Sequence, residues 1–237
     1  MKSLLSMFGV LLLLVLGACG TTVPGPETDG EPPGEEDLEG YEDMEEEEEG
    51  SGDAHEDSAD VQLSDYFMPD GSIAYFEGYG NEYAQLNLRT VFLENNHVAV
   101  YEDNGGTVLL SVYRLTDNRI DLVLEEGEYY DEYRPTASEL DALEPISVYL
   151  EFPIEEGQSI GNQTVIETGA ALETYYGEFE NVFILEETFE SGGFNKTYFA
   201  EGYGEVMREY RANADDPDEY AITSILKRID MDGSKGK

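Results

Sequence analysis

Apolar and polar residues alternate in short runs along most of the chain after about residue 60. Four of the clearest runs are residues 84–92, 119–124, 146–152 and 180–189. Alternation with a period of two over five to ten residues predicts β-strands with one buried face. In the second run we expect Ile120, Leu122 and Leu124 to share a face. Residues 182–185 are all apolar, so both faces of that strand are expected to meet apolar surroundings.

Turn-forming residues separate these runs. They fall at residues 69–71, 104–106, 116–118 and 191–193. The Asn104-Gly105-Gly106 segment, between two apolar runs, is the strongest hairpin signal of the four. One segment, residues 136–143, predicts a short helix instead, because Thr136 and Glu139 have the spacing of a capping box.

Together these elements predict one all-β domain with minor α content over residues 61–230, followed by a tail at residues 231–237. About ten strands are expected, and a domain of this length can bury a substantial core. The arrangement that suits such strands is a curved antiparallel sheet, closed as a half-barrel or a sandwich.

Two segments of similar sequence, residues 75–80 and 198–204, carry our candidate site. Glycine inside a strand marks a bulge or a close approach of another backbone. The candidate ligand-binding residues flank these glycines and are Glu77, Tyr79, Asn81, Glu82, Tyr83, Glu201 and Tyr203. A groove lined by tyrosines and a few carboxylates suits an apolar or cationic ligand. Alternatively, these residues only set the strand twist and a bulge.

The charge of the chain is strongly negative, at −42, and unevenly spread. Residues 20–60 contain 18 Asp and Glu, and no Lys or Arg occurs between Lys2 and Arg89. Such a segment cannot bury enough apolar surface to offset its chain entropy, so we expect a disordered acidic linker over residues 19–60. Because phosphates would be repelled, nucleic acid is not an expected partner.

The N-terminus indicates where the protein goes. Lys2 precedes an apolar run that ends in small residues, which is typical of a secretory signal peptide over residues 1–18. The segment Leu16-Gly17-Ala18-Cys19 resembles a bacterial lipobox. That resemblance implies a diacylglyceryl thioether on Cys19, the only cysteine of the chain, and therefore a membrane-anchored protein on the extracytoplasmic face.

Two longer passages carry a second resemblance. Their motifs are G-x-G-N-E-Y-A at residues 78–84, N-G-G-T-V at residues 104–108, G-x-F-x-N-V at residues 177–182 and Y-F-A-x-G-x-G-x-V at residues 198–206. In these motifs the chain resembles extracytoplasmic lipoproteins of Firmicutes-type bacteria. The resemblance covers most of residues 66–229 and implies an all-β domain in which residues 198–206 form a strand. It implies no particular activity.

The chain offers little catalytic chemistry. His55 lies in the acidic segment, and His97 follows two asparagines, where we expect an exposed turn. Two such histidines predict no metal site, and no nucleophile motif or phosphate-binding loop is present. The acidic cluster at residues 215–219 is expected to be a solvated loop. We therefore expect no catalytic residues, no metal and no cofactor, and a protein that is not an enzyme.

The sequence predicts a lipid-anchored protein that presents a non-enzymatic β-rich binding or interaction domain at the cell envelope. Its expected partners are the membrane, through Cys19, and an envelope protein or small ligand. The alternative is a carrier of a small ligand or lipid, with a pocket on the concave face of the sheet; an envelope hydrolase is the third and weakest alternative.

Overall fold

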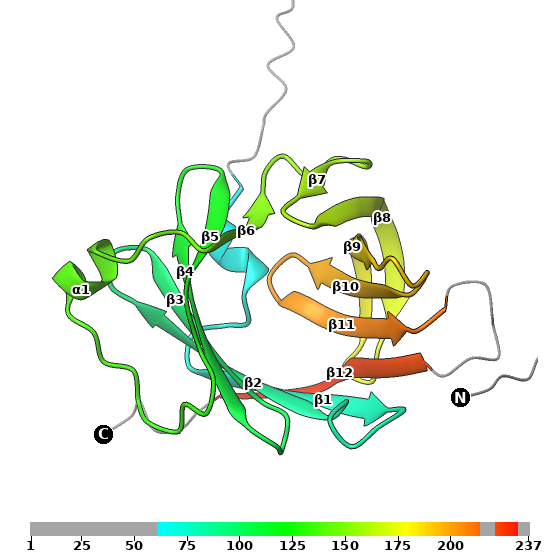
Figure 1. The fold of residues 1–237 in the computed structure, drawn as a ribbon, viewed down its shortest axis with the longest axis horizontal. Coiled ribbons are helices and arrows are strands. Elements are labelled where there is room, and N and C mark those ends of the chain that lie inside the picture. The colour runs from blue at the N-terminus through cyan, green and yellow to red at the C-terminus, as the bar shows by residue number, and fades with distance from the viewer. Residues whose placement is uncertain (1–60, 214–220, 232–237) are drawn as a thin grey trace, which may run out of the picture. The chain divides into compact units, whose positions relative to one another are not determined.

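A computed structural model describes residues 61–213 and 221–231. All of its strands belong to one twelve-stranded antiparallel sheet, with the order β6-β5-β4-β3-β2-β1-β12-β11-β10-β9-β8-β7 (Figure 1). The elements in chain order are η1 (Leu63–Tyr66, a 3₁₀ helix), β1 (Ser72–Tyr79), β2 (Leu86–Leu93), β3 (His97–Asp103), β4 (Val108–Leu115), β5 (Arg119–Glu126), α1 (Ala137–Asp141), β6 (Ser147–Glu151), β7 (Ser159–Ile160), β8 (Gln163–Glu173), β9 (Glu178–Thr188), β10 (Phe194–Ala200), β11 (Gly204–Arg211) and β12 (Ala221–Met231).

The sheet curls until its two end strands, β6 and β7, come into contact, which makes a nearly closed barrel (Figure 1). The predicted all-β class and curved antiparallel sheet are confirmed. The sheet has twelve strands where about ten were expected. One reason is that β7 contains only two residues, too few to show any alternation.

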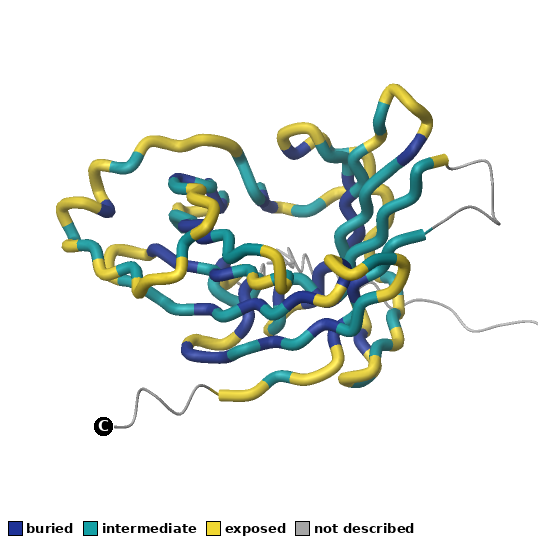
Figure 2. The backbone as a smooth tube through the Cα atoms, turned by 60° about the horizontal axis from the view of Figure 1, so that its bottom comes forward, coloured by how far each residue is buried: buried dark blue, intermediate teal, exposed yellow. Residues whose placement is uncertain are grey.

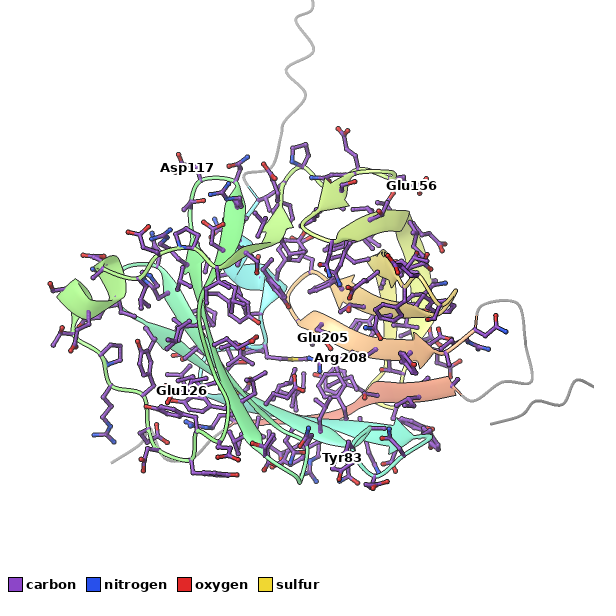
Figure 3. The ribbon with its side chains drawn as sticks, in the orientation of Figure 1. Tyr83, Asp117, Glu126, Glu156, Glu205 and Arg208 are labelled. Carbon is purple, nitrogen blue, oxygen red and sulfur yellow. The ribbon has the colours of Figure 1, made fainter. Side chains whose placement is uncertain are left out.

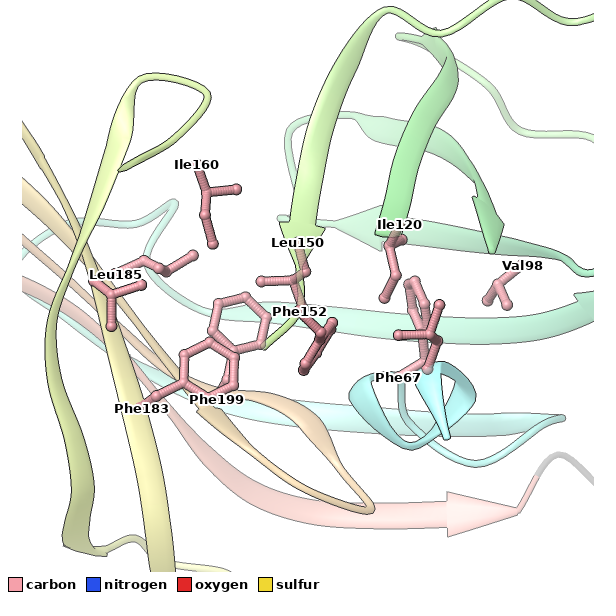
Figure 4. Close-up of a cluster of buried hydrophobic side chains, with 11 residues drawn as sticks. Phe67, Val98, Ile120, Leu150, Phe152, Ile160, Phe183, Leu185 and Phe199 are labelled. Atoms are coloured by element: carbon pink, nitrogen blue, oxygen red, sulfur yellow. The ribbon is translucent and has the colours of Figure 1, made fainter. Parts of the chain in front are cut away.

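Apolar side chains from both halves of the sheet fill one part of the interior (Figure 4). The segment of η1 supplies Leu63 and Phe67, and the rings of Phe183 and Phe199 stack with centroids 5.0 Å apart. The buried members of this cluster are Leu63, Phe67, Val98, Ile120, Leu150, Phe152, Ile160, Val165, Phe183, Leu185 and Phe199. This cluster packs strands from the two ends of the sheet against each other. The end strands β6 and β7 are not paired with each other in the sheet.

The strand β9 has two buried faces, as its sequence predicts. Phe183 and Leu185 belong to the cluster just described, whereas Val182 and Ile184 belong to a second cluster with Phe76 and Leu226, among others. The turn between β8 and β9 also bends back toward β12, where the amide of Tyr176 donates a hydrogen bond of 3.2 Å to the carbonyl of Leu226. Over the whole sheet, most buried residues lie in the strands, and many exposed residues lie in the loops (Figure 2).

The predicted alternation in β5 is wrong. Ile120, Asp121 and Val123 are the buried residues, and the pairing with β4 shifts register at Val123, the extra residue between Leu122 and Leu124. The bulge moves Leu124 to the cluster on the α1 side of the sheet, away from the cluster that contains Ile120. Asp121, 1% exposed, is compensated by Arg119 at 2.9 Å and Arg114 at 3.8 Å.

Residues 198–206 do not form the single strand that the sequence resemblance implies. They form a hairpin, in which β10 ends at Ala200 and β11 begins at Gly204. Gly202 and Gly204 have φ values of +82° and +71°, which side chains with a Cβ rarely adopt, so the glycines serve the turn here. Residues 75–79, by contrast, lie within β1, so the two similar segments are not equivalent in structure.

His97 is buried, 2% exposed, and the prediction of an exposed turn residue is wrong. The turn itself is present, because Asn95 and Asn96 have φ values of +54° and +55° between β2 and β3. His97 begins the next strand on the same face as Ala99 and Tyr101, which the α1 segment covers, and its Nδ1 lies 2.7 Å from the carbonyl of Asn95. The α1 segment packs over this face of the sheet, so a side chain that begins the strand there is not exposed.

The predicted helix is confirmed as α1, together with its capping box between Thr136 and Glu139. Within residues 61–213 and 221–231, no helix is long and apolar enough to cross a membrane. The predictions for the signal peptide, Cys19, the acidic linker, His55 and the acidic cluster at residues 215–219 lie outside the described residues.

Candidate functional site

A cavity of about 360 Å³ opens within the curl of the sheet, next to the apolar cluster. Polar side chains from both halves of the sheet line it, and Tyr83, 56% exposed, stands where it meets solvent. Its lining residues are Asn81, Tyr83, Ala84, Leu86, Glu102, Gln163, Glu187, Asn195, Lys196, Thr197, Arg208, Glu209, Tyr210, Ile222 and Ser224. We call this space the interior cavity.

Arg208 lies between the two halves of the sheet, beside Glu205 (Figure 3). Its guanidinium pairs with both carboxylate oxygens of Glu205, one of them through Nη2 at 3.0 Å. Its Nη1 lies 2.8 Å from the Oε2 of Glu102, which comes from β3 on the opposite half of the sheet. We call these three residues the Arg208 triad, and they link β3 to β11 across the barrel.

The triad is only partly buried, because it borders open space. The side chain of Arg208 is 34% accessible, that of Glu102 24% and that of Glu205 10%, and two of the three line the interior cavity. Burial raises the pKa of the Glu205 carboxyl, against the opposing effect of Arg208. Burial would lower the pKa of Arg208, but the two carboxylates raise it well above its ordinary value, so the guanidinium stays charged.

A second, much smaller cavity of about 40 Å³ lies on the other side of the triad. Glu102, Glu205 and Arg208 line it together with four tyrosines, Tyr66, Tyr113, Tyr149 and Tyr203. Burial raises the pKa of both Tyr113 and Tyr149, so these phenols remain neutral hydrogen-bonding groups. The space is enough for a water molecule or two but not for an organic ligand.

Two of the seven sequence-predicted site residues, Asn81 and Tyr83, line the interior cavity. They belong to the loop between β1 and β2, in which the side chain of Asn81 accepts a 2.9 Å hydrogen bond from the amide of Tyr83. This bond across two residues is a turn that fixes the loop at the edge of the cavity. Glu82, between them, is exposed and is not part of the lining.

The other predicted residues lie elsewhere. Glu77 pairs with Lys227, and the Tyr79 hydroxyl lies 2.6 Å from that of Tyr175, both on the face of β1 opposite the buried Phe76. Glu201 and Tyr203 lie in the β10–β11 turn and line a shallow depression with residues 178–181, and Tyr203 also borders the small cavity beside the triad. The structure therefore does not bring the seven residues into one groove.

The sequence pattern did not predict Glu102, Glu187, Glu205 and Arg208 as site residues. A signal was present in β11, where Arg208 shares the inward parity of the fully buried Val206. The alternation of apolar and polar residues in β11 does not show whether a charged residue faces a cavity or lies at the frayed end of a strand. Within the described ranges, no group of three or more His, Cys, Asp and Glu side chains is arranged to hold a metal ion.

No protein-family model and no curated protein matches the chain. Two solved structures are similar to it. One is a Bacteroides fragilis protein described as exported and as having a YmcC-like fold, with a TM-score of 0.42 and 14% identity, covering 70% of this chain and 98% of that one. The other, from Parabacteroides distasonis, is described as a lipoprotein, with a TM-score of 0.37, 13% identity and the same coverage. The resemblance to Firmicutes-type lipoproteins stays a prediction.

Proposed function

We propose that this protein is a lipid-anchored protein of the extracytoplasmic face that binds a small polar molecule in its interior cavity. The placement outside the cytoplasm rests on the signal peptide and on Cys19. The binding function rests on the cavity itself. Of the first two functions that the sequence predicts, the small-ligand alternative gains the stronger support from this geometry, and neither of these two requires catalysis.

The observation that carries the proposal is the Arg208 triad at the wall of a cavity of about 360 Å³. Buried ion pairs are costly to desolvate, and apolar residues of similar volume often give a more stable core. Small-molecule sites commonly occupy 300–1,000 Å³, with a few polar groups that orient the ligand. A charged triad retained beside an open space of that size is therefore more consistent with ligand binding than with packing.

A different observation supports interaction with another protein as the second candidate. Three exposed tyrosines lie close together on the outer surface, with Tyr79 at 47%, Tyr175 at 56% and Tyr176 at 42% exposure. Tyrosine is enriched at protein interfaces because its ring is large and rigid and its hydroxyl can bond to polar groups. The two candidates use different surfaces and are separable by mutation.

The test is native mass spectrometry of the full chain, extracted from membranes in mild detergent. We expect a co-purifying small molecule that is lost in Thr197→Trp, which fills the cavity, and retained in Thr188→Trp at the exposed end of β9. If the wild-type protein carries no ligand and binds none from a metabolite mixture, or if binding survives Thr197→Trp, the cavity is not the site.

A further inference from the structure

The charges around the interior cavity do not balance. Arg208 is the cation of the triad, and it is shared between two carboxylates, Glu102 and Glu205. Glu102 and Glu187 line the cavity with Arg208, and Glu205 lies behind Arg208. When ionised, Arg208 and the three carboxylates carry a net negative charge. An anion that entered the cavity would be repelled, because Arg208 is already paired with two of these carboxylates.

Two other charged residues of the lining have their partners outside. The ammonium of Lys196 lies 3.4 Å from Glu186 and 4.6 Å from the ring centre of Phe194. The carboxylate of Glu209 contacts Arg211 at 2.6 Å and also accepts a hydrogen bond from a tyrosine. These groups belong to the outer surface of β10 and β11, so they do not correct the imbalance within the cavity.

Glu187 is the carboxylate of the wall that lacks a cation. Its side chain accepts a hydrogen bond from the amide of Asn162, a neutral group, and no basic residue in the described part of the chain forms an ion pair with it. Glu186, the preceding residue, faces the other way and pairs with Lys196. Glu186 and Glu187 are neighbours on β9 but point to opposite faces. Only Glu187, on the inner face, can pair with a cation that enters the cavity.

Aromatic rings complete the site. Tyr83 stands at the opening and Tyr210 lines the wall, where its ring centre lies 6.2 Å from that of Phe189. The electron-rich faces of such rings attract organic cations, and the attraction strengthens as water is excluded. The combination of an unpaired carboxylate, two tyrosines and amide side chains such as Asn81 and Asn195 suits an ammonium group on a small organic body.

We infer that the interior cavity binds a small organic cation, with its ammonium group at Glu187 and its body against Tyr83 and Tyr210. This inference rests on the proposed small-molecule function and specifies its ligand class. In this arrangement the Arg208 triad forms part of the cavity wall and does not bind the charged group of the ligand.

The test measures binding of putrescine and choline, with succinate as the anionic probe, to the full chain in detergent by isothermal titration calorimetry. A chain of net charge −42 attracts cations over its whole surface, so matched variants are essential. We expect Glu187→Gln to weaken cation binding about tenfold or more, the loss of one charge-assisted contact, and Glu186→Gln to leave it unchanged.

Equal weakening of cation binding in both variants would indicate surface counter-ions and overturn the inference. The inference would also be overturned if neither putrescine nor choline binds. Saturable binding of succinate that is lost in Thr197→Trp would overturn the cationic class while leaving a small-molecule function in place. If none of the probes binds and native mass spectrometry also finds an empty cavity, the proposed function fails along with the inference.

Discussion

Gly78, within β1, lies where another segment of backbone passes very close. A Cβ at this position would lie 2.0 Å from the backbone nitrogen of Gln85 and 2.3 Å from the carbonyl carbon of Ala84. The loop that carries Asn81 and Tyr83 therefore folds back onto β1 only because residue 78 has no side chain. This close approach is the reason that the sequence analysis suggested for a glycine in the strand.

We expect Gly78→Ala to destabilise the protein by about 1–3 kcal/mol or more, because backbone must move to admit the methyl group. Gly127→Ala is the control, since no atom lies within 4 Å of its added Cβ and its φ is not positive. Urea unfolding followed by circular dichroism measures both. Equal stability of the two variants would show that the loop is free to shift away from residue 78.

Glu205 gives a pH dependence of defined sign. Burial raises its pKa in the folded protein, so the folded state binds this proton more readily than the unfolded chain does. The stability linked to Glu205 is greatest below its unfolded pKa of about 4.3 and decreases as the pH rises through the higher, folded value. We expect the unfolding free energy of the wild type, minus that of Glu205→Gln, to decrease between about pH 4 and pH 7.

The measurement is urea unfolding of both proteins at several pH values in this range. Subtracting the variant removes the contribution of the many other carboxylates, which the two proteins share. A difference that increases with pH would show that the fold stabilises the ionised form of Glu205, and that Arg208 outweighs burial.

At the scale of elements, α1 combines a local signal with a tertiary contact. The hydroxyl of Thr136 accepts a hydrogen bond from the amide of Glu139, and the Glu139 carboxylate accepts one from the amide of Thr136. Leu140, 1% exposed, packs into the cluster formed by Tyr101, Leu110 and neighbouring residues on the outer side of the sheet. A helix of five residues is too short to be stable alone, so the packing of Leu140 holds it in place.

We expect Leu140→Ala to lower the unfolding free energy by about 2–5 kcal/mol and Thr136→Ala by about 1 kcal/mol. Ser138→Ala, at an exposed position of the same helix, is the control and should cause no loss. Chemical unfolding of the three variants gives the comparison. A larger effect at Thr136 than at Leu140 would mean that capping, rather than burial, determines whether α1 forms.

At the scale of the whole molecule, the curled sheet collects residues that are far apart in the chain. Glu102 on β3, Glu187 on β9 and Arg208 on β11 meet around one cavity because the two halves of the sheet face each other. The apolar cluster around Phe183 and Phe199 fills the neighbouring part of the interior. The cavity is therefore a property of the closed arrangement and of no single strand.

The predicted anchor also belongs to this scale, because it decides where the whole domain is held. We expect Cys19→Ser to move the protein from the membrane fraction to the soluble fraction, since two acyl chains anchor stably and an unacylated chain does not. Cell fractionation and mass spectrometry of the N-terminal peptide measure this. A substituted protein that remained acylated or membrane-bound would contradict the lipobox assignment.

Several local elements were predictable from the sequence because their causes are local. The capping box of α1 depends on two residues three positions apart, and the turns at Asn104-Gly105-Gly106 and residues 191–193 depend on glycine. The two buried faces of residues 182–185 follow from four apolar residues in succession. In these cases the local sequence determines the structure, and contacts with distant parts of the chain are not needed to predict it.

Tertiary structure decided the rest. The bulge in β5 depends on its pairing with β4, and the burial of His97 depends on the α1 segment that covers its face of the sheet. The sequence singled out Asn81 and Tyr83, which line the cavity, because they stand beside strand glycines. Glu187 and Arg208 were not singled out, because alternation assigns a side chain to a face, while only the curl of the sheet determines that this face encloses a cavity rather than a packed core.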